Sequence, residues 1–123
     1  MRNIAAVLAV VVLVLAGCTD QPVGSADCNT QIRVDDVVYT SYGFTREPAT
    51  EHRPAEVAAC HDVGPDPEGS VFTDDGATVT SWRFDGYSAD EVLGVRQDRH
   101  RYVVLVATSV SDTDRDRIMA ALG

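Results

Sequence analysis

The segment Tyr102–Ala107, with the sequence YVVLVA, is an unbroken apolar run whose residues favour β-structure. Such a run is typical of a strand that is covered on both of its faces. We predict that it is the central part of a strand over His100–Ser109, which pairs with a strand over Glu91–Gln97 across a turn at Asp98-Arg99. A second layer must then cover the other face of this strand, and the C-terminal segment is the obvious candidate.

That C-terminal segment has the features of an amphipathic helix. Ser111 is a good helix cap, and Asp112 and Asp114 favour the positive end of a helix dipole. The apolar residues of the segment form one stripe, made of Ile118, Met119 and Leu122. We therefore predict a C-terminal helix that packs on the sheet.

The earlier part of the chain predicts a hairpin and then an irregular stretch. Asn29–Val34 and Val37–Phe44 are rich in β-forming residues and flank Asp35-Asp36, a pair that tolerates a tight turn. From Thr45 to Glu68 we expect no long regular element, because four prolines interrupt it. Within this stretch we predict only a short strand, at Ala55–Cys60. The prolines are Pro48, Pro54, Pro65 and Pro67.

A second hairpin is predicted around Asp75-Gly76, which lies between Val71–Thr73 and Ala77–Phe84. A chain of 123 residues holds one domain at most. The segments together predict an α+β fold: an antiparallel sheet of five to six strands with a C-terminal helix packed on one face and one disulfide.

The start of the chain resembles the signal peptide of a bacterial lipoprotein. A basic start at Arg2 precedes fourteen uncharged residues, Ile4–Gly17, which are fewer than the ~20 that a membrane-spanning helix needs. The run ends in Leu15-Ala16-Gly17-Cys18, which matches the lipobox that the lipidating enzymes accept. A plain secretory peptide cut near Ala16 or Gly17, and an uncleaved helix, are the alternatives.

The lipobox divides the chain into three parts. We predict a lipoprotein signal peptide over residues 1–17, a lipidated Cys18 with a flexible tether over 18–26, and a small globular domain over 27–123. Two or more acyl chains on one cysteine make an anchor that hardly dissociates. We therefore expect the domain to be lipid-anchored on the extracytoplasmic face of the cell membrane.

The chain has three cysteines, and the lipid anchor accounts for one of them. With Cys18 bound to lipid, Cys28 and Cys60 form an even pair in an oxidising compartment, and we predict a disulfide between them. Metal binding is the alternative, because Cys60-His61-Asp62 brings three potential ligands together. Adjacent residues of an extended chain point to opposite sides, however, and no CxxC or HxxxH spacing is present.

The formal net charge of −9 argues against nucleic acid as a partner, because phosphate would repel such a surface. All 10 basic residues are arginine. The acidic stretch Cys60–Gly76 lacks the DxDxDG pattern of a calcium loop, so we expect it to be a solvated loop.

The arrangement resembles a family of small actinobacterial lipoproteins of unknown function. The likeness depends on Cys28, on a strand pair ending in Tyr42-Gly43, on the second cysteine within Ala58–Asp62, and on the corner Phe84-Asp85-Gly86. Family members have Pro before the second cysteine and Asp directly after it, whereas Ala59 and His61 take those places here. The resemblance implies the lipid anchor and the disulfide, and no activity, ligand or catalytic residue.

No catalytic motif is present, and we expect a non-catalytic protein without a cofactor. Ser41, His61 and Asp62 could be assembled as a triad on paper, but there is no GxSxG nucleophile elbow. The glycines form no phosphate-binding loop. A metal site made of His52, His61 and nearby carboxylates is an alternative function, while His100 is expected at the surface.

An envelope protein or surface ligand is the partner that we expect. Five aromatic residues could contribute to a binding surface, although at strand periodicity aromatics are more often core or cross-strand pairs. Tyr42 and Tyr87 are the candidate partner-binding residues, since each lies where a strand runs into a loop. The five are Tyr39, Tyr42, Phe44, Trp82 and Tyr87.

Overall fold

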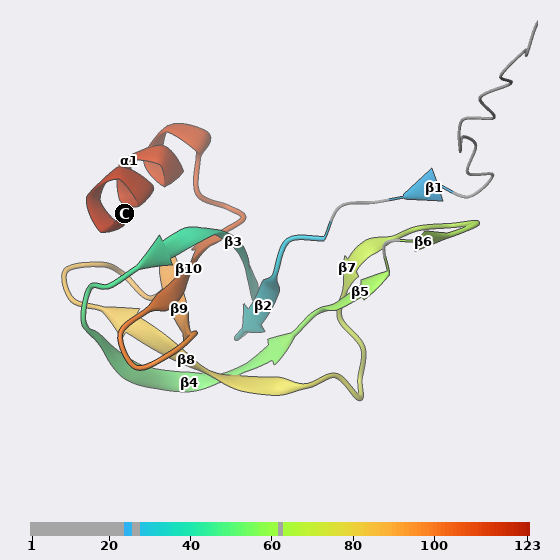
Figure 1. The fold of residues 1–123 in the computed structure, drawn as a ribbon, viewed down its shortest axis with the longest axis horizontal. Coiled ribbons are helices and arrows are strands. Elements are labelled where there is room, and N and C mark those ends of the chain that lie inside the picture. The colour runs from blue at the N-terminus through green and yellow to red at the C-terminus, as the bar shows by residue number, and fades with distance from the viewer. Residues whose placement is uncertain (1–23, 26–27, 62) are drawn as a thin grey trace, which may run out of the picture.

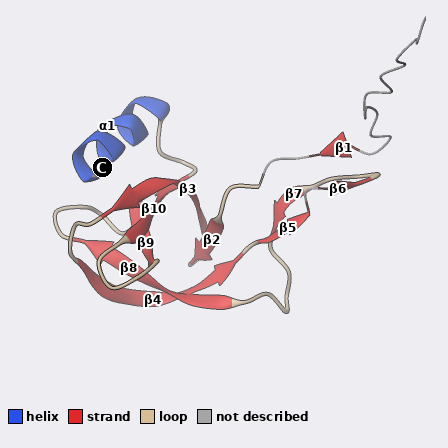
Figure 2. Cartoon of the chain, viewed as in Figure 1, coloured by secondary structure: helices blue, strands red, loops and turns tan. Residues whose placement is uncertain are grey.

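The structure is a computed structural model that describes residues 24–25, 28–61 and 63–123. The predicted signal peptide, Cys18 and most of the tether lie outside the described residues. The described part consists of strands and one C-terminal helix, with the helix at one end and two short strand pairs at the other (Figures 1 and 2).

Six strands form an antiparallel sheet that closes on itself, which confirms the predicted sheet. Each strand pairs with the next around the sheet, in the order β10-β3-β2-β4-β8-β9, and β9 pairs with β10 to close it. The strands are β2 (Gln31–Val34), β3 (Val37–Thr45), β4 (Ala49–Val57), β8 (Thr78–Phe84), β9 (Val92–Arg96) and β10 (Tyr102–Ala107).

Helix α1 (Asp112–Leu122) follows β10 and packs against the sheet next to β3, as the C-terminal stripe predicts (Figure 1). The Ser111 side chain caps it by accepting a hydrogen bond from the Asp114 backbone amide, at 3.2 Å. Ile118 and Leu122 are buried. At the other end, the Thr45 hydroxyl of β3 donates to the Leu122 carbonyl, which satisfies one of the helix's last free acceptors.

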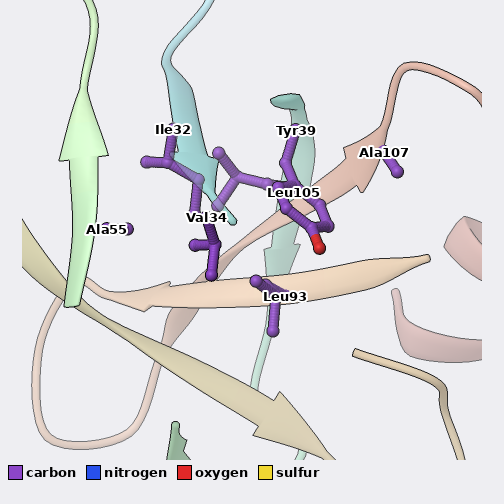
Figure 3. Close-up of a cluster of buried hydrophobic side chains, with 7 residues drawn as sticks. All are labelled: Ile32, Val34, Tyr39, Ala55, Leu93, Leu105 and Ala107. Atoms are coloured by element: carbon purple, nitrogen blue, oxygen red, sulfur yellow. The ribbon is translucent and has the colours of Figure 1, made fainter. Parts of the chain in front are cut away.

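Strand β10 is buried on both faces, so the interpretation of YVVLVA as a doubly covered strand is confirmed. Leu105 and Ala107 belong to one cluster of buried side chains, in which Tyr39 and Ile32 lie beside them (Figure 3). The alternate residues of β10 belong to a second cluster, which includes the buried residues of α1. That second set from β10 is Tyr102, Val104 and Val106.

A glycine allows two strands of this second cluster to approach closely. Gly94 of β9 pairs with Trp82 of β8, and a Cβ atom built on Gly94 would lie 2.7 Å from Cζ of Phe84. Such a contact is shorter than van der Waals packing allows. The absence of a side chain at Gly94 therefore lets the Phe84 ring rest against the backbone of β9, where the sheet closes.

The first predicted hairpin is confirmed. Asp35 and Asp36 connect β2 to β3, and both have positive φ angles, 49° and 67°. Aspartate tolerates this left-handed conformation better than most residues, and two such residues in succession match the twist of a hairpin. The pair β9–β10 is confirmed as well, with the predicted turn residues in the connection between them.

The prediction of an irregular stretch over Thr45–Glu68 is wrong. Strand β4 runs through it and includes Pro54, where the pairing with β8 shifts register. A bulge releases the backbone from regular pairing, which is where proline is tolerated in a sheet. The buried Ser81 hydroxyl satisfies the Arg53 backbone at this point, accepting from its amide at 3.2 Å and donating to its carbonyl at 2.7 Å.

The second predicted hairpin is also wrong. Strand β7 (Gly69–Val71) pairs with β5 (Ala59–His61) instead of with β8. We call residues 59–76 the disulfide arm, because Cys60 of β5 is bonded to Cys28, with 5.8 Å between their Cα atoms. The predicted disulfide is therefore present. A further short pair joins β1 (Gly24–Ser25) to β6 (Val63–Gly64).

Candidate functional site

Tyr42 protrudes from the closed sheet at a bulge in β3. Val104 of β10 pairs with Gly43 and Leu105 pairs with Ser41, so Tyr42 is an extra residue without a partner in this ladder. Bulges of this kind redirect a side chain and are common beside functional sites. The side chain of Tyr42 is 44% exposed, and that of Phe44, two residues on, is 51% exposed. These are the two large hydrophobic side chains that stand exposed on the described part of the chain.

An arginine side chain lies over each of these aromatic rings. The Arg115 guanidinium of α1 lies 4.9 Å from the centroid of the Tyr42 ring, and the Arg101 guanidinium lies 4.9 Å from that of Phe44. Both distances are within the range of a cation–π interaction. We call these four residues the aromatic–arginine ridge: Tyr42, Phe44, Arg101 and Arg115.

Carboxylates hold both arginines of the ridge in place. Arg115 lies 3.1 Å from Asp112 and 3.1 Å from Asp116, and its interactions with Tyr42 and then Asp116 raise its pKa. Arg101 lies 3.7 Å from Asp98. The pKa of Asp98 is lowered, first by a hydrogen bond from the His100 backbone amide and also by the charge of Arg101. Each guanidinium group that lies over a ring of the ridge therefore also lies beside at least one carboxylate.

Phe44 stands between two hollows in the surface. One has a volume of about 440 Å³ and lies between the end of α1 and the connection from β3 to β4, with Arg46, Glu47 and Leu122 in its walls. The other lies beside Tyr42 and has polar walls contributed by Asn29, Ser41 and Gln97. A projecting aromatic ridge with hollows on both sides presents apolar area and hydrogen-bonding groups together, which is the composition of a recognition surface.

Tyr87, the other predicted binding residue, lies elsewhere. It is half-buried, packs against the second core cluster, and lines a hollow with Pro48 and Ala121. This hollow shares Glu47 and Leu122 with the hollow beside Phe44 but does not include Tyr42 or Phe44. The structure does not place Tyr42 and Tyr87 in one hollow. Tyr39 and Phe84 are core residues, and Trp82 packs partly buried against the core.

The histidines do not gather into a ligand set. His52 lies on β4, where burial first, and then the charges of Arg53 and Arg83, lower its pKa. His61 lies on the disulfide arm, with its Nδ1 atom 3.6 Å from Glu68. Within residues 28–61 and 63–123 no group of three or more His, Cys, Asp or Glu side chains is arranged to hold a metal ion. Asp62 lies outside the described residues.

The sequence patterns did not identify Phe44, Arg101 and Arg115 as site residues. Phe44 was grouped with the aromatics that are more often core, and nothing in the order of residues links an arginine of α1 to a tyrosine of β3. One signal was available, because Tyr42 and Phe44 share a period of two that Tyr39 does not. The bulge that turns Tyr42 outward depends on the pairing with β10, which local patterns do not specify.

Comparison with known proteins gives a family and nothing beyond it. No curated protein and no solved structure matches the chain. Among the described residues, no helix has the length and apolarity needed to cross a membrane. A model for DUF6281, a family of unknown function, matches residues 16–121, which is most of the chain. The chain therefore belongs to the DUF6281 family.

Proposed function

We propose that this chain is a lipid-anchored, non-catalytic binding module of the bacterial cell envelope, and that the aromatic–arginine ridge is the surface that recognises its partner, an envelope protein. The anchor is supported by the lipobox at Leu15–Cys18, and the family match begins at residue 16 and so includes Cys18. The predicted extracytoplasmic location accords with a disulfide between Cys28 and Cys60, since such bonds persist in oxidising compartments.

One observation supports the binding role above the others: Tyr42 and Phe44 are exposed although they are large and apolar. Tyrosine and arginine are enriched among the residues that dominate protein–protein binding energies, and phenylalanine is enriched at protein interfaces. The two guanidinium groups stiffen the rings, which lowers the entropy lost on binding. No observation on the described residues favours the metal-binding alternative.

The test is crosslinking of the full-length chain in intact cells of its source. The wild-type chain, the double variant Tyr42→Ala/Phe44→Ala and a control variant are expressed at equal levels. We expect a discrete crosslinked partner with the wild type and its loss in the double variant. The matched control is Phe72→Ala, which removes an aromatic ring that also lies under an arginine, Arg33 at 4.7 Å, but outside the ridge.

Separate outcomes contradict the ridge and the anchor. The ridge is wrong if the same partner is retained by the double variant, or is lost equally with Phe72→Ala. Tyr87→Ala serves as a further comparison, and a loss of the partner with that variant alone would move the surface to the hollow near Ala121. The anchor is wrong if mass spectrometry finds an unmodified thiol on Cys18, or if the protein enters the aqueous phase of a detergent partition.

A further inference from the structure

Arginines gather at one end of the closed sheet, next to the ridge. Arg46 lies in the walls of three neighbouring hollows, two of which it shares with Arg101 and two with Arg99. We call Arg46, Arg99 and Arg101 the arginine end. They are three of the 10 basic residues in a chain of net charge −9. Their positive charges thus contrast with the net negative charge of the whole chain.

Two of these charges lie near each other. Tyr102 of β10 and Thr45 of β3 are the last pair of their ladder, and Arg101 and Arg46 are the next residues in the sequence. Both arginines line the same two hollows. Like charges that lie near each other repel, and an anion between them would offset this repulsion.

Carboxylates of the chain offset it only in part. Asp98 lies 3.7 Å from Arg101, and Glu47 lines two of the three hollows. Neither Arg46 nor Arg99 has a carboxylate within 4 Å among the described residues. Glu47 and Gly123, the last residue of the sequence, also line the first hollow, but neither places a carboxylate within 4 Å of Arg46 or Arg99. Two guanidinium groups of the arginine end are therefore without a carboxylate partner among the described residues.

We infer that the arginine end binds carboxylates, supplied by an acidic segment of the partner protein. The planar guanidinium group presents paired N–H donors that match the two oxygens of a carboxylate. Arg101 belongs to both surfaces, because it lies over Phe44 while it lines the hollow with Arg46. A bound segment would thus place apolar side chains on the ridge and acidic side chains on the arginine end.

The position of the arginine end favours a protein segment over membrane lipid. The connections that carry Arg46 and Arg99–Arg101 lie at one end of the molecule, whereas β1, the first described strand, lies at the other (Figure 1). Cys18 precedes β1 by only six residues in the sequence, so a lipid on Cys18 would be joined to the chain near β1. This part of the inference depends on the proposed function, since it takes the anchor and the protein partner from there.

Titration of the full-length chain, purified in neutral detergent, with a fluorescent hexaglutamate peptide tests the inference. We expect saturable binding that weakens as salt is added, because exposed charges are screened. Arg46→Gln should weaken binding about tenfold, the effect of losing one charge-assisted hydrogen bond. Arg46→Lys should retain part of the affinity, because it keeps the charge and loses the paired donors.

Arg83→Gln is the matched control, since Arg83 is an exposed arginine of β8 outside the arginine end. The inference is overturned if the peptide does not bind, or if Arg83→Gln weakens binding as much as Arg46→Gln. It is also overturned if the only ligands are inorganic phosphate, or vesicles of anionic phospholipid, tested in parallel. The crosslinking experiment tests Tyr42 and Phe44, whereas this titration tests Arg46. The proposed function and this inference can therefore fail independently of each other.

Discussion

The closed sheet and the disulfide arm belong to one chain but are held in different ways. Every strand of the closed sheet has two neighbours, and its side chains form two clusters of buried residues. Of the described residues of the arm, none belongs to either cluster, and all three residues of β5 are exposed. It is connected to the sheet by the bond from Cys60 to Cys28, by a hydrogen bond from Ser70 to the Asn29 carbonyl at 2.9 Å, and by the Phe72 ring under Arg33.

This difference separates two sources of order. In the closed sheet, apolar burial and paired backbone groups fix each residue, so stability is distributed over many contacts. In the arm, a covalent bond limits the freedom of a segment that buries little. We therefore expect the two regions to respond differently to the same size of perturbation.

The largest expected effect is in the closed sheet. Leu105 is fully buried, and Leu105→Ala should lower the free energy of unfolding by about 4 kcal/mol, from lost burial and the cavity that remains. Val71→Ala in the arm should cost under about 1 kcal/mol, because Val71 is only half-buried. Urea denaturation of both variants measures the difference. Equal losses would show that the arm is packed as firmly as the sheet.

The same contrast explains what could be predicted from the sequence. The helix, the β2–β3 hairpin and the doubly buried β10 each follow from local signals: a cap at Ser111, turn residues at Asp35-Asp36, and the YVVLVA run. These signals act over a few residues and do not depend on the rest of the fold. The disulfide followed from a count of cysteines rather than from geometry.

The incorrect predictions share one physical cause. In each case the local structure depends on contacts with residues that are distant in the sequence. Pro54 is accommodated in β4 because the Ser81 hydroxyl, 27 positions later in the sequence, satisfies the backbone beside it. The arm pairs β7 with β5 rather than β8, although Asp75-Gly76 favours a hairpin. The ridge is a further case, since Arg101 and Arg115 meet Phe44 and Tyr42 only after β3, β10 and α1 have assembled.

The second effect concerns the disulfide. The double variant Cys28→Ser/Cys60→Ser removes a link between residues 32 positions apart, which should cost roughly 3.5 kcal/mol in the chain-entropy model. Beyond this global loss, we expect the amides of β5 and β7 to exchange with solvent through local opening, while those of β9 and β10 exchange only through unfolding. Hydrogen exchange followed by mass spectrometry resolves the two regions.

Leu105→Ala is the control for this experiment, because it destabilises the domain by a similar amount and keeps the disulfide. In that variant the β5 and β7 amides should remain as protected, relative to the global free energy, as in the wild type. If they lose protection equally in both variants, the covalent bond does not hold the arm, and the comparison between the two regions fails.

The smallest expected effect is a pH dependence of stability that arises in the closed sheet. Burial and the nearby Arg53 and Arg83 lower the pKa of His52 on β4 below its ordinary value of 6.5. As the pH falls through 6.5 the unfolded chain therefore takes up this proton before the folded chain does. Stability from this residue is fully present above pH 6.5 and decreases as the pH falls toward the folded pKa. His52→Gln should flatten this part of the stability curve, because it removes the titrating imidazole of β4. A nuclear magnetic resonance titration that places the His52 midpoint at or above 6.5 would contradict the assignment, since it would mean that the closed sheet does not shield this side chain.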